Sequence, residues 1–93
     1  MERIVYLERE SMIADVRQPS FVHDWVEYAR TKPAQVAERL AGATIAIINK
    51  VPLPGVAVDA LPDLKMVAVA ATGTNIVDLD ACRRRGIVVS NIR

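Results

Sequence analysis

Two segments of the chain are apolar on both faces of an extended strand, and this pattern limits the fold more than any other feature. They are Ala43–Ile48 (ATIAII) and Lys65–Ala71 (KMVAVAA). A strand with one face in water would alternate apolar and polar residues, whereas an unbroken apolar run is typical of a central strand in a parallel sheet. Parallel strands need helical crossovers between them. The two segments therefore predict an α/β architecture.

The rest of the chain supplies the other strands and the crossovers. Further strands are expected at Ile4–Leu7, Trp25–Tyr28 and Ile87–Val89, and helices at residues 33–41, Val56–Leu61 and Leu79–Arg85. Asp78 is expected to cap the last helix, and Gly86 to end it in the left-handed conformation. The alternation predicts a flavodoxin-like five-stranded parallel sheet with helices on both faces and the strand order 2-1-3-4-5.

Composition excludes several classes of partner. The 93 residues form one domain, and 12 Lys and Arg against 11 Asp and Glu give no basic surface for a nucleic acid. No window reaches the roughly 20 apolar residues of a membrane span, so no membrane partner is expected. The single cysteine, Cys82, cannot form an internal disulfide and is predicted to be a buried structural thiol. This usage fits a reducing cytoplasm.

Ligands of open parallel sheets bind at the carboxyl ends of the strands. Three loops are predicted there: Glu8–Ser11, Asn49–Gly55 and Thr72–Asp78. The last two follow the most apolar strands and are expected to be neighbours. Glu8 and Glu10 are interpreted as part of a solvated loop.

The residues of the chain lack the complete pattern of three familiar kinds of site. A dinucleotide fingerprint needs closely spaced glycines, and Gly42, Gly55, Gly73 and Gly86 are far apart. A lone Thr72-Gly73-Thr74 is equally compatible with a plain turn and with an anion cradle. A phosphoacceptor receiver would need an aspartate where Asn49 stands. His23 is interpreted as surface or packing in an irregular segment, and no metal-ligand or catalytic constellation is predicted.

Four segments carry a resemblance to a known family: Asn49–Leu53 (NKVPL), Leu61–Lys65 (LPDLK), Ala70–Leu79 (AATGTNIVDL) and Arg85–Asn91 (RGIVVSN). With these segments the chain resembles the D-isomer-specific 2-hydroxyacid dehydrogenases, most closely the glycerate dehydrogenase and hydroxypyruvate reductase branch. The resemblance covers nearly the whole chain and is weakest at residues 8–24.

The resemblance implies that residues 1–93 are the N-terminal substrate-binding segment of an NAD- or NADP-dependent oxidoreductase. Lys50, Val51, Thr72 and Gly73 would bind the carboxylate of a small 2-keto or 2-hydroxy acid, such as hydroxypyruvate or glyoxylate, at the mouth of an interdomain cleft. Asn75 and Asp78 would shape the elbow beside it.

The family's Rossmann cofactor domain and catalytic residues lie downstream of the point where this chain stops. The chain alone is therefore expected to bind no cofactor and to be inactive, with the missing cofactor domain as its partner. A stand-alone flavodoxin-like binding or interaction module without catalysis is the alternative, and homo-oligomer formation is a further possibility.

Overall fold

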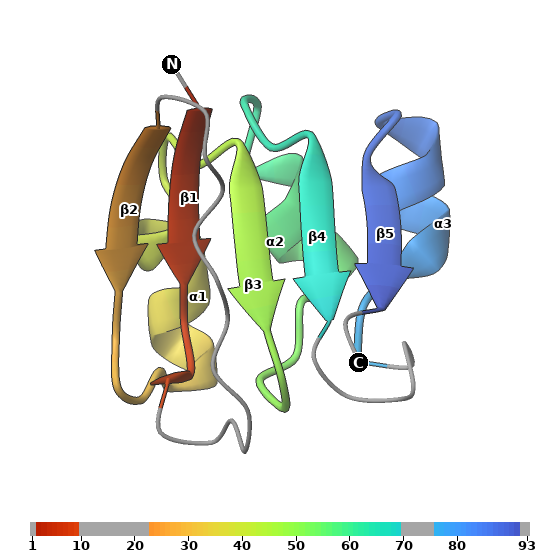
Figure 1. Cartoon of the computed structure of the whole chain (residues 1–93). Coiled ribbons are helices and arrows are strands. Elements are labelled where there is room, and N and C mark those ends of the chain that lie inside the picture. Colours follow the sequence, from red (N-terminus) through yellow and green to blue (C-terminus); the bar gives the residue numbers. More distant parts are fainter. Residues whose placement is uncertain (1, 10–22, 70–75, 92–93) are drawn as a thin grey trace.

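A computed structural model describes residues 2–9, 23–69 and 76–91 of the chain. Five parallel strands form one sheet in the order β2-β1-β3-β4-β5, and all five arrows point the same way in Figure 1. The strands are β1 Glu2–Tyr6, β2 His23–Glu27, β3 Ile45–Ile48, β4 Met66–Val69 and β5 Val88–Asn91. The predicted class and strand order are confirmed.

The described helices all lie on one face of the sheet, behind the strands in Figure 1. They are the 3-10 helix η2 Pro33–Gln35 and the α-helices α1 Val36–Arg39, α2 Gly55–Asp59 and α3 Leu79–Arg84. The crossovers from β2 to β3, β3 to β4 and β4 to β5 step in the same direction, so right-handed connections place their helices on the same face. These are the three helical segments that the sequence predicted, and no helix among the described residues lies on the second face, where helices were also expected.

The core has two layers because successive residues of each strand point to opposite faces. The layer beneath the helices contains strand residues such as Val5, Ala46, Ile48, Val67 and Val69 together with helix residues such as Val36, Val58, Ala81 and Cys82. The layer on the second face is smaller and contains Ile4, Tyr6, Ile47 and Ala68. This double burial is the physical reason why the central strands lack polar alternation.

The ends of several elements differ from the expectation. His23 is the first residue of β2 and is paired with Glu2, so its assignment to an irregular segment was wrong. The helix expected over residues 33–41 begins as a 3-10 turn at Pro33 and ends before Gly42, whose φ of +79° is the left-handed conformation that favours glycine. Strand β3 begins at Ile45, two residues later than expected.

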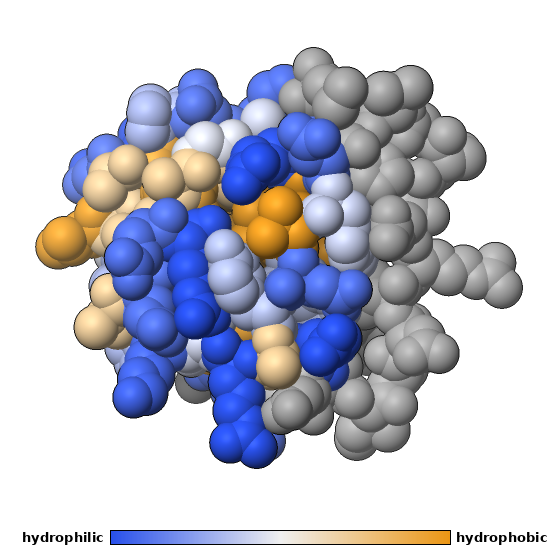
Figure 2. All heavy atoms as spheres, turned by 90° about the vertical axis from the view of Figure 1, so that its left-hand side faces the viewer, coloured by the Kyte–Doolittle hydropathy of each residue, from blue (hydrophilic) through white to orange (hydrophobic). Residues whose placement is uncertain are grey.

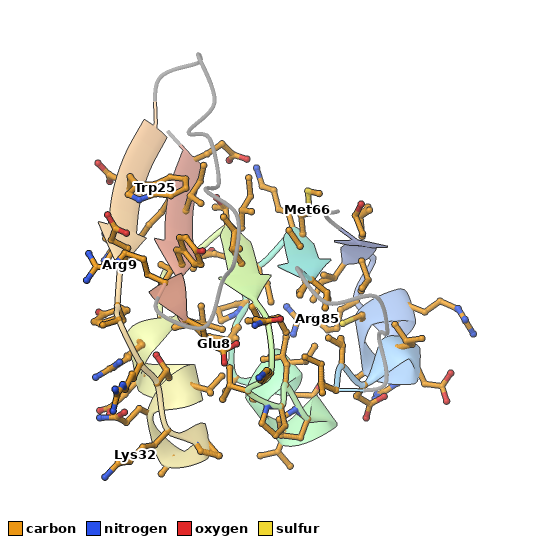
Figure 3. The ribbon with its side chains drawn as sticks, turned by 60° about the horizontal axis from the view of Figure 1, so that its bottom comes forward. Glu8, Arg9, Trp25, Lys32, Met66 and Arg85 are labelled. Atoms are coloured by element: carbon orange, nitrogen blue, oxygen red, sulfur yellow. The ribbon has the colours of Figure 1, made fainter. Side chains whose placement is uncertain are left out.

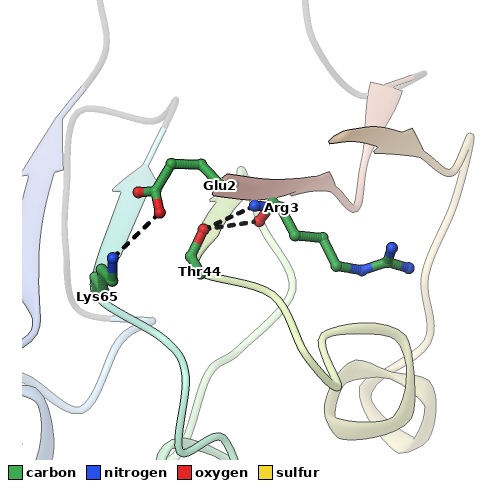
Figure 4. A network of polar contacts seen from close by, with 4 residues as sticks. All are labelled: Glu2, Arg3, Thr44 and Lys65. Carbon is green, nitrogen blue, oxygen red and sulfur yellow. Dashed lines mark hydrogen bonds and ion pairs between the residues drawn. The ribbon is translucent and has the colours of Figure 1, made fainter. Parts of the chain in front are cut away.

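A polar network fixes the amino-terminal edge of the sheet (Figure 4). The Thr44 hydroxyl accepts a hydrogen bond from the Arg3 N–H at 2.9 Å and donates one to the Arg3 carbonyl at 3.2 Å. Beside it, the Lys65 ammonium lies 3.2 Å from a carboxylate oxygen of Glu2. Thr44 therefore ties the residue before β3 to the start of β1.

Strand β2 forms one edge of the sheet, and hydrophilic side chains cover most of the described surface on that side (Figure 2). Arg9 and Glu27 form an ion pair at 3.8 Å, and the Arg39 guanidinium lies 4.2 Å from the centre of the Tyr28 ring. Charged side chains discourage further strands from pairing with such an edge. Across the described ranges, the helices are too short to cross a membrane.

Candidate functional site

Glu8 occupies the carboxyl-terminal edge of the sheet in a way that the sequence did not suggest. Its residue is 7% exposed, so its interpretation as part of a solvated loop was wrong; Glu10 lies outside the described residues. The chain on either side is held in place: the Leu7 N–H donates to the Ile47 carbonyl at 3.1 Å, and the Arg9 N–H to the Tyr28 carbonyl at 3.0 Å. These bonds fix the backbone from which the Glu8 side chain extends.

The Glu8 carboxylate accepts hydrogen bonds from three successive backbone amides that follow β3. The Asn49 and Lys50 N–H groups donate to Oε2 at 2.5 and 2.7 Å, and the Val51 N–H lies 3.1 Å from both oxygens. Figure 3 shows Glu8 at the middle of this edge. Successive amides of this kind form an anion-binding nest, and here the anion is a side chain of the same protein.

A backbone bridge joins the loop after β3 to the segment before α3. The Leu53 N–H donates to the Ile76 carbonyl at 2.7 Å, and the Asp78 N–H donates to the Leu53 carbonyl at 3.0 Å, which pairs Leu53 with Val77. The prediction that these two loops are neighbours is confirmed. Thr72, Gly73 and Asn75, which the sequence analysis placed at the site, lie outside the described residues.

Asp78 caps α3, as predicted: its Oδ1 accepts a hydrogen bond from the Ala81 N–H at 3.0 Å. Its other oxygen, Oδ2, lies against Gly55, where an added Cβ would be only 2.7 Å away. The absence of a side chain at Gly55 therefore lets the cap of α3 approach the first residue of α2. Gly55 was predicted as the last residue of the loop Asn49–Gly55, and its contact with Asp78 was not expected.

Two of the residues predicted to bind substrate, Lys50 and Val51, lie at the carboxyl-terminal edge of the sheet, and their surroundings differ. Lys50 is exposed, whereas Val51 is 5% exposed and packs in the core beneath the helices. Their backbone N–H groups are both used by Glu8. Lys50 therefore brings a positively charged side chain to the edge from a backbone that is already fixed.

The described turn after β3 does not suit a dinucleotide cofactor. A phosphate cradle needs free backbone N–H groups at the start of a helix. The N–H groups of residues 49–51 serve Glu8, and Pro52 and Pro54 have none. In the described ranges there is also no group of three His, Cys, Asp or Glu residues that could hold a metal ion, and His23 lies at the opposite edge of the sheet.

Comparisons with known proteins agree with this architecture. Residues 5–93 match the catalytic domain of the D-isomer specific 2-hydroxyacid dehydrogenases. The chain is 50% identical to glycerate dehydrogenase from Methylorubrum extorquens, over 99% of this chain and 30% of that protein. It is 37% identical to hydroxypyruvate reductase from Blautia hydrogenotrophica, over 67% of this chain and 19% of that protein.

Solved structures share the fold at lower identity. The NAD+-bound 3-phosphoglycerate dehydrogenase of Entamoeba histolytica superposes with a TM-score of 0.75 at 23% identity, over 97% of this chain and 32% of that one. The D-lactate dehydrogenase of Escherichia coli superposes with a TM-score of 0.72 at 19% identity, over 99% of this chain and 31% of that one. The chain thus spans about a third or less of the relatives it matches. It belongs to the D-isomer-specific 2-hydroxyacid dehydrogenase family.

Proposed function

We propose that the chain is the substrate-binding portion of an NAD- or NADP-dependent 2-hydroxyacid dehydrogenase of the cytoplasm. The parent reaction transfers a hydride between a nicotinamide and a small 2-keto or 2-hydroxy acid, with hydroxypyruvate or glyoxylate as the first substrates to test. The observation that carries the proposal is the organised carboxyl edge: Glu8 and the Leu53–Val77 bridge hold three segments side by side in a chain half identical to a glycerate dehydrogenase.

In this proposal the residues of the chain bind and orient the acid. Lys50 attracts the substrate carboxylate with its ammonium, and Val51 forms the apolar floor beneath it. Thr72 and Gly73 supply backbone amides to the carboxylate. Gly73 has no Cβ, so the carboxylate can approach its amide closely. Asn75 and Asp78 shape the elbow between β4 and α3. We assign no catalytic acid or base to these 93 residues.

The nicotinamide would be held by a separate cofactor domain. Two observations support this division: the sequence has no closely spaced glycines, and the amides after β3 are occupied by Glu8. Closure of the two domains on the acid would exclude water and fix the orientation of the carbonyl. Alone, the chain is expected to have no dehydrogenase activity.

A hybrid enzyme tests the proposal directly. Residues 1–93 of this chain would replace the matching 93 residues of the M. extorquens glycerate dehydrogenase, which differ at half of the positions. We expect the hybrid to oxidise NADH or NADPH with hydroxypyruvate or glyoxylate, and the isolated chain to show no turnover. The parent enzyme is the positive control.

A soluble, folded hybrid that binds the cofactor but reduces neither acid would contradict the dehydrogenase assignment. That result would favour a flavodoxin-like interaction module, the alternative function for this fold. Lys50→Ala in the hybrid supplies the site test, because removal of the ammonium should raise KM for the acid while KM for the cofactor stays unchanged.

A further inference from the structure

Glu8 is the one buried charged side chain among the described residues, and the proposed function uses it only to hold segments of the chain together, with no part in binding the acid. We propose that Glu8 is a built-in ligand of the amide nest at residues 49–51 and a positioning residue for Lys50. The nest is permanently filled by this carboxylate, so the substrate acid meets the Lys50 side chain and not the amides of residues 49–51. The part of this inference that concerns substrate rests on the proposed function.

The geometry favours the internal carboxylate over any free one. Glu8 extends from a backbone held on both sides, at Leu7 and Arg9, so its carboxylate is always present beside the nest. A tethered group of this kind has a high effective concentration, and a free acid must give up its translational freedom to compete with it. Charge-assisted hydrogen bonds to three N–H groups add to this advantage.

Filling the nest also has a consequence for the loop. Val51 is anchored in the core, and Glu8 holds the amides of the two residues before it, so the backbone of Lys50 is held on both sides. Lys50 itself remains exposed. A fixed backbone reduces the conformational freedom that Lys50 must lose when it binds an acid. Removal of Glu8 should therefore loosen the loop and weaken binding of the acid.

The first test is amide hydrogen exchange of the chain, measured by NMR. In Glu8→Ala, we expect exchange at Asn49, Lys50 and Val51 to rise about tenfold or more, the size expected for loss of a hydrogen bond to a charged group. Sodium acetate should restore protection at these amides in a concentration-dependent way, because acetate can enter the vacated nest. Sodium chloride at equal ionic strength should not.

Two further variants keep this test decisive. Glutamine has nearly the same size as glutamate, so Glu8→Gln should fold even if Glu8→Ala does not. Its NH2 group takes the place of one carboxylate oxygen, and because Val51 bonds both oxygens, amide exchange at Val51 should rise most. Thr44→Val is the matched control, because it removes two hydrogen bonds at the opposite edge of the sheet. It should leave residues 49–51 and their response to acetate unchanged.

The second test uses the hybrid enzyme. Glu8→Gln should raise KM for hydroxypyruvate about tenfold with a smaller change in kcat, Glu8→Asp should recover part of the loss because it keeps the charge, and Thr44→Val should leave KM unaltered. Unchanged KM in Glu8→Gln, or unchanged exchange at residues 49–51 in the Glu8 variants, would overturn the inference. The inference would also be overturned if the NMR signals of the wild-type amides of residues 49–51 moved when glyoxylate is added. An inactive wild-type hybrid contradicts the proposed function instead, since the exchange measurements decide the role of Glu8 without it.

Discussion

Cys82 lies on the buried side of α3 and is 1% exposed. Burial raises the pKa of its thiol, the negative charge of Asp78 raises it further, and the positive charge of Arg85 offsets part of the rise. The folded chain therefore holds the thiol proton more tightly than the unfolded chain does. This contribution to stability is fully present below the unfolded pKa, 9.0, and is lost as the pH rises through the folded pKa.

We predict that the free energy of unfolding falls more steeply above pH 9.0 in the wild-type chain than in Cys82→Ala. The alanine variant lacks the group that must ionise, so only the slope common to the other residues remains. Urea unfolding at a series of pH values between neutral and alkaline measures both slopes. Parallel slopes in the two proteins would contradict the prediction.

A second prediction concerns Gly55, whose backbone Asp78 approaches closely. A Cβ here would lie 2.7 Å from Asp78 Oδ2 and would push the carboxylate off the Ala81 N–H. We expect Gly55→Ala to reduce the free energy of unfolding by about 1 kcal/mol, the usual size of a lost N-cap. In an Asp78→Ala background the clash is absent, and Gly55→Ala should instead stabilise by about 0.5 kcal/mol, because alanine is the better helix former.

Denaturant unfolding of the four proteins in this cycle gives the coupling between residues 55 and 78. An equal effect of Gly55→Ala in both backgrounds would show that the contact has no energetic consequence.

Cys82, Asp78 and Glu8 differ in how far the sequence predicted their surroundings. The burial of Cys82 and the cap at Asp78 are local properties of a helix pattern, and both predictions are confirmed. The burial of Glu8 is not local, since its partners at residues 49–51 are more than 40 residues away. Nothing in ERES distinguishes a buried acid from a solvated one until the sheet brings β1 and β3 together. Strand order alone, with an acid just after β1, was the available signal.

Arg85 joins the helices α2 and α3. Its guanidinium donates to the Val58 carbonyl at 2.8 Å and to the Leu61 carbonyl at 3.1 Å, at the carboxyl end of α2. Helices of five and six residues are too short to be stable alone, so contacts of this kind hold them in place. The sequence did not predict this contact. The contact depends on where α2 ends in space, which helical periodicity does not fix.

We expect Arg85→Ala to reduce the free energy of unfolding by about 1–3 kcal/mol, because two carbonyls lose a charged donor. Arg85→Lys should recover only part of this loss, since one ammonium does not reproduce the planar fork of the guanidinium. Arg84→Ala is the matched control. Arg84 is exposed, so its replacement should change the free energy of unfolding by no more than about 0.5 kcal/mol. Equal effects at Arg84 and Arg85 in thermal or urea unfolding would contradict the assigned role.

The two edge strands of the sheet, β2 and β5, are unlike each other. The β2 edge carries charged side chains such as Asp24 and Glu27, both exposed. On the β5 edge, Val88 is 62% exposed, on the face opposite Val89, which packs against the core. No further strand among the described residues pairs with β5. An edge strand with an exposed β-branched residue is a template for pairing with another chain.

We therefore predict concentration-dependent self-association of the 93-residue chain through β5. Pairing of β5 with β5 of a second copy about a two-fold axis would use the same surface on both copies and close after two, so the expected product is a dimer. Val88→Lys should shift the equilibrium toward monomer, because pairing would bring two like charges close together. Val56→Lys is the control, since Val56 is 83% exposed but lies on α2, away from either edge. Sedimentation velocity over a range of concentrations measures the shift. A wild-type chain that stays monomeric, or equal effects of the two lysine variants, would show that β5 is not the contact and that its exposed valine is tolerated as a free edge.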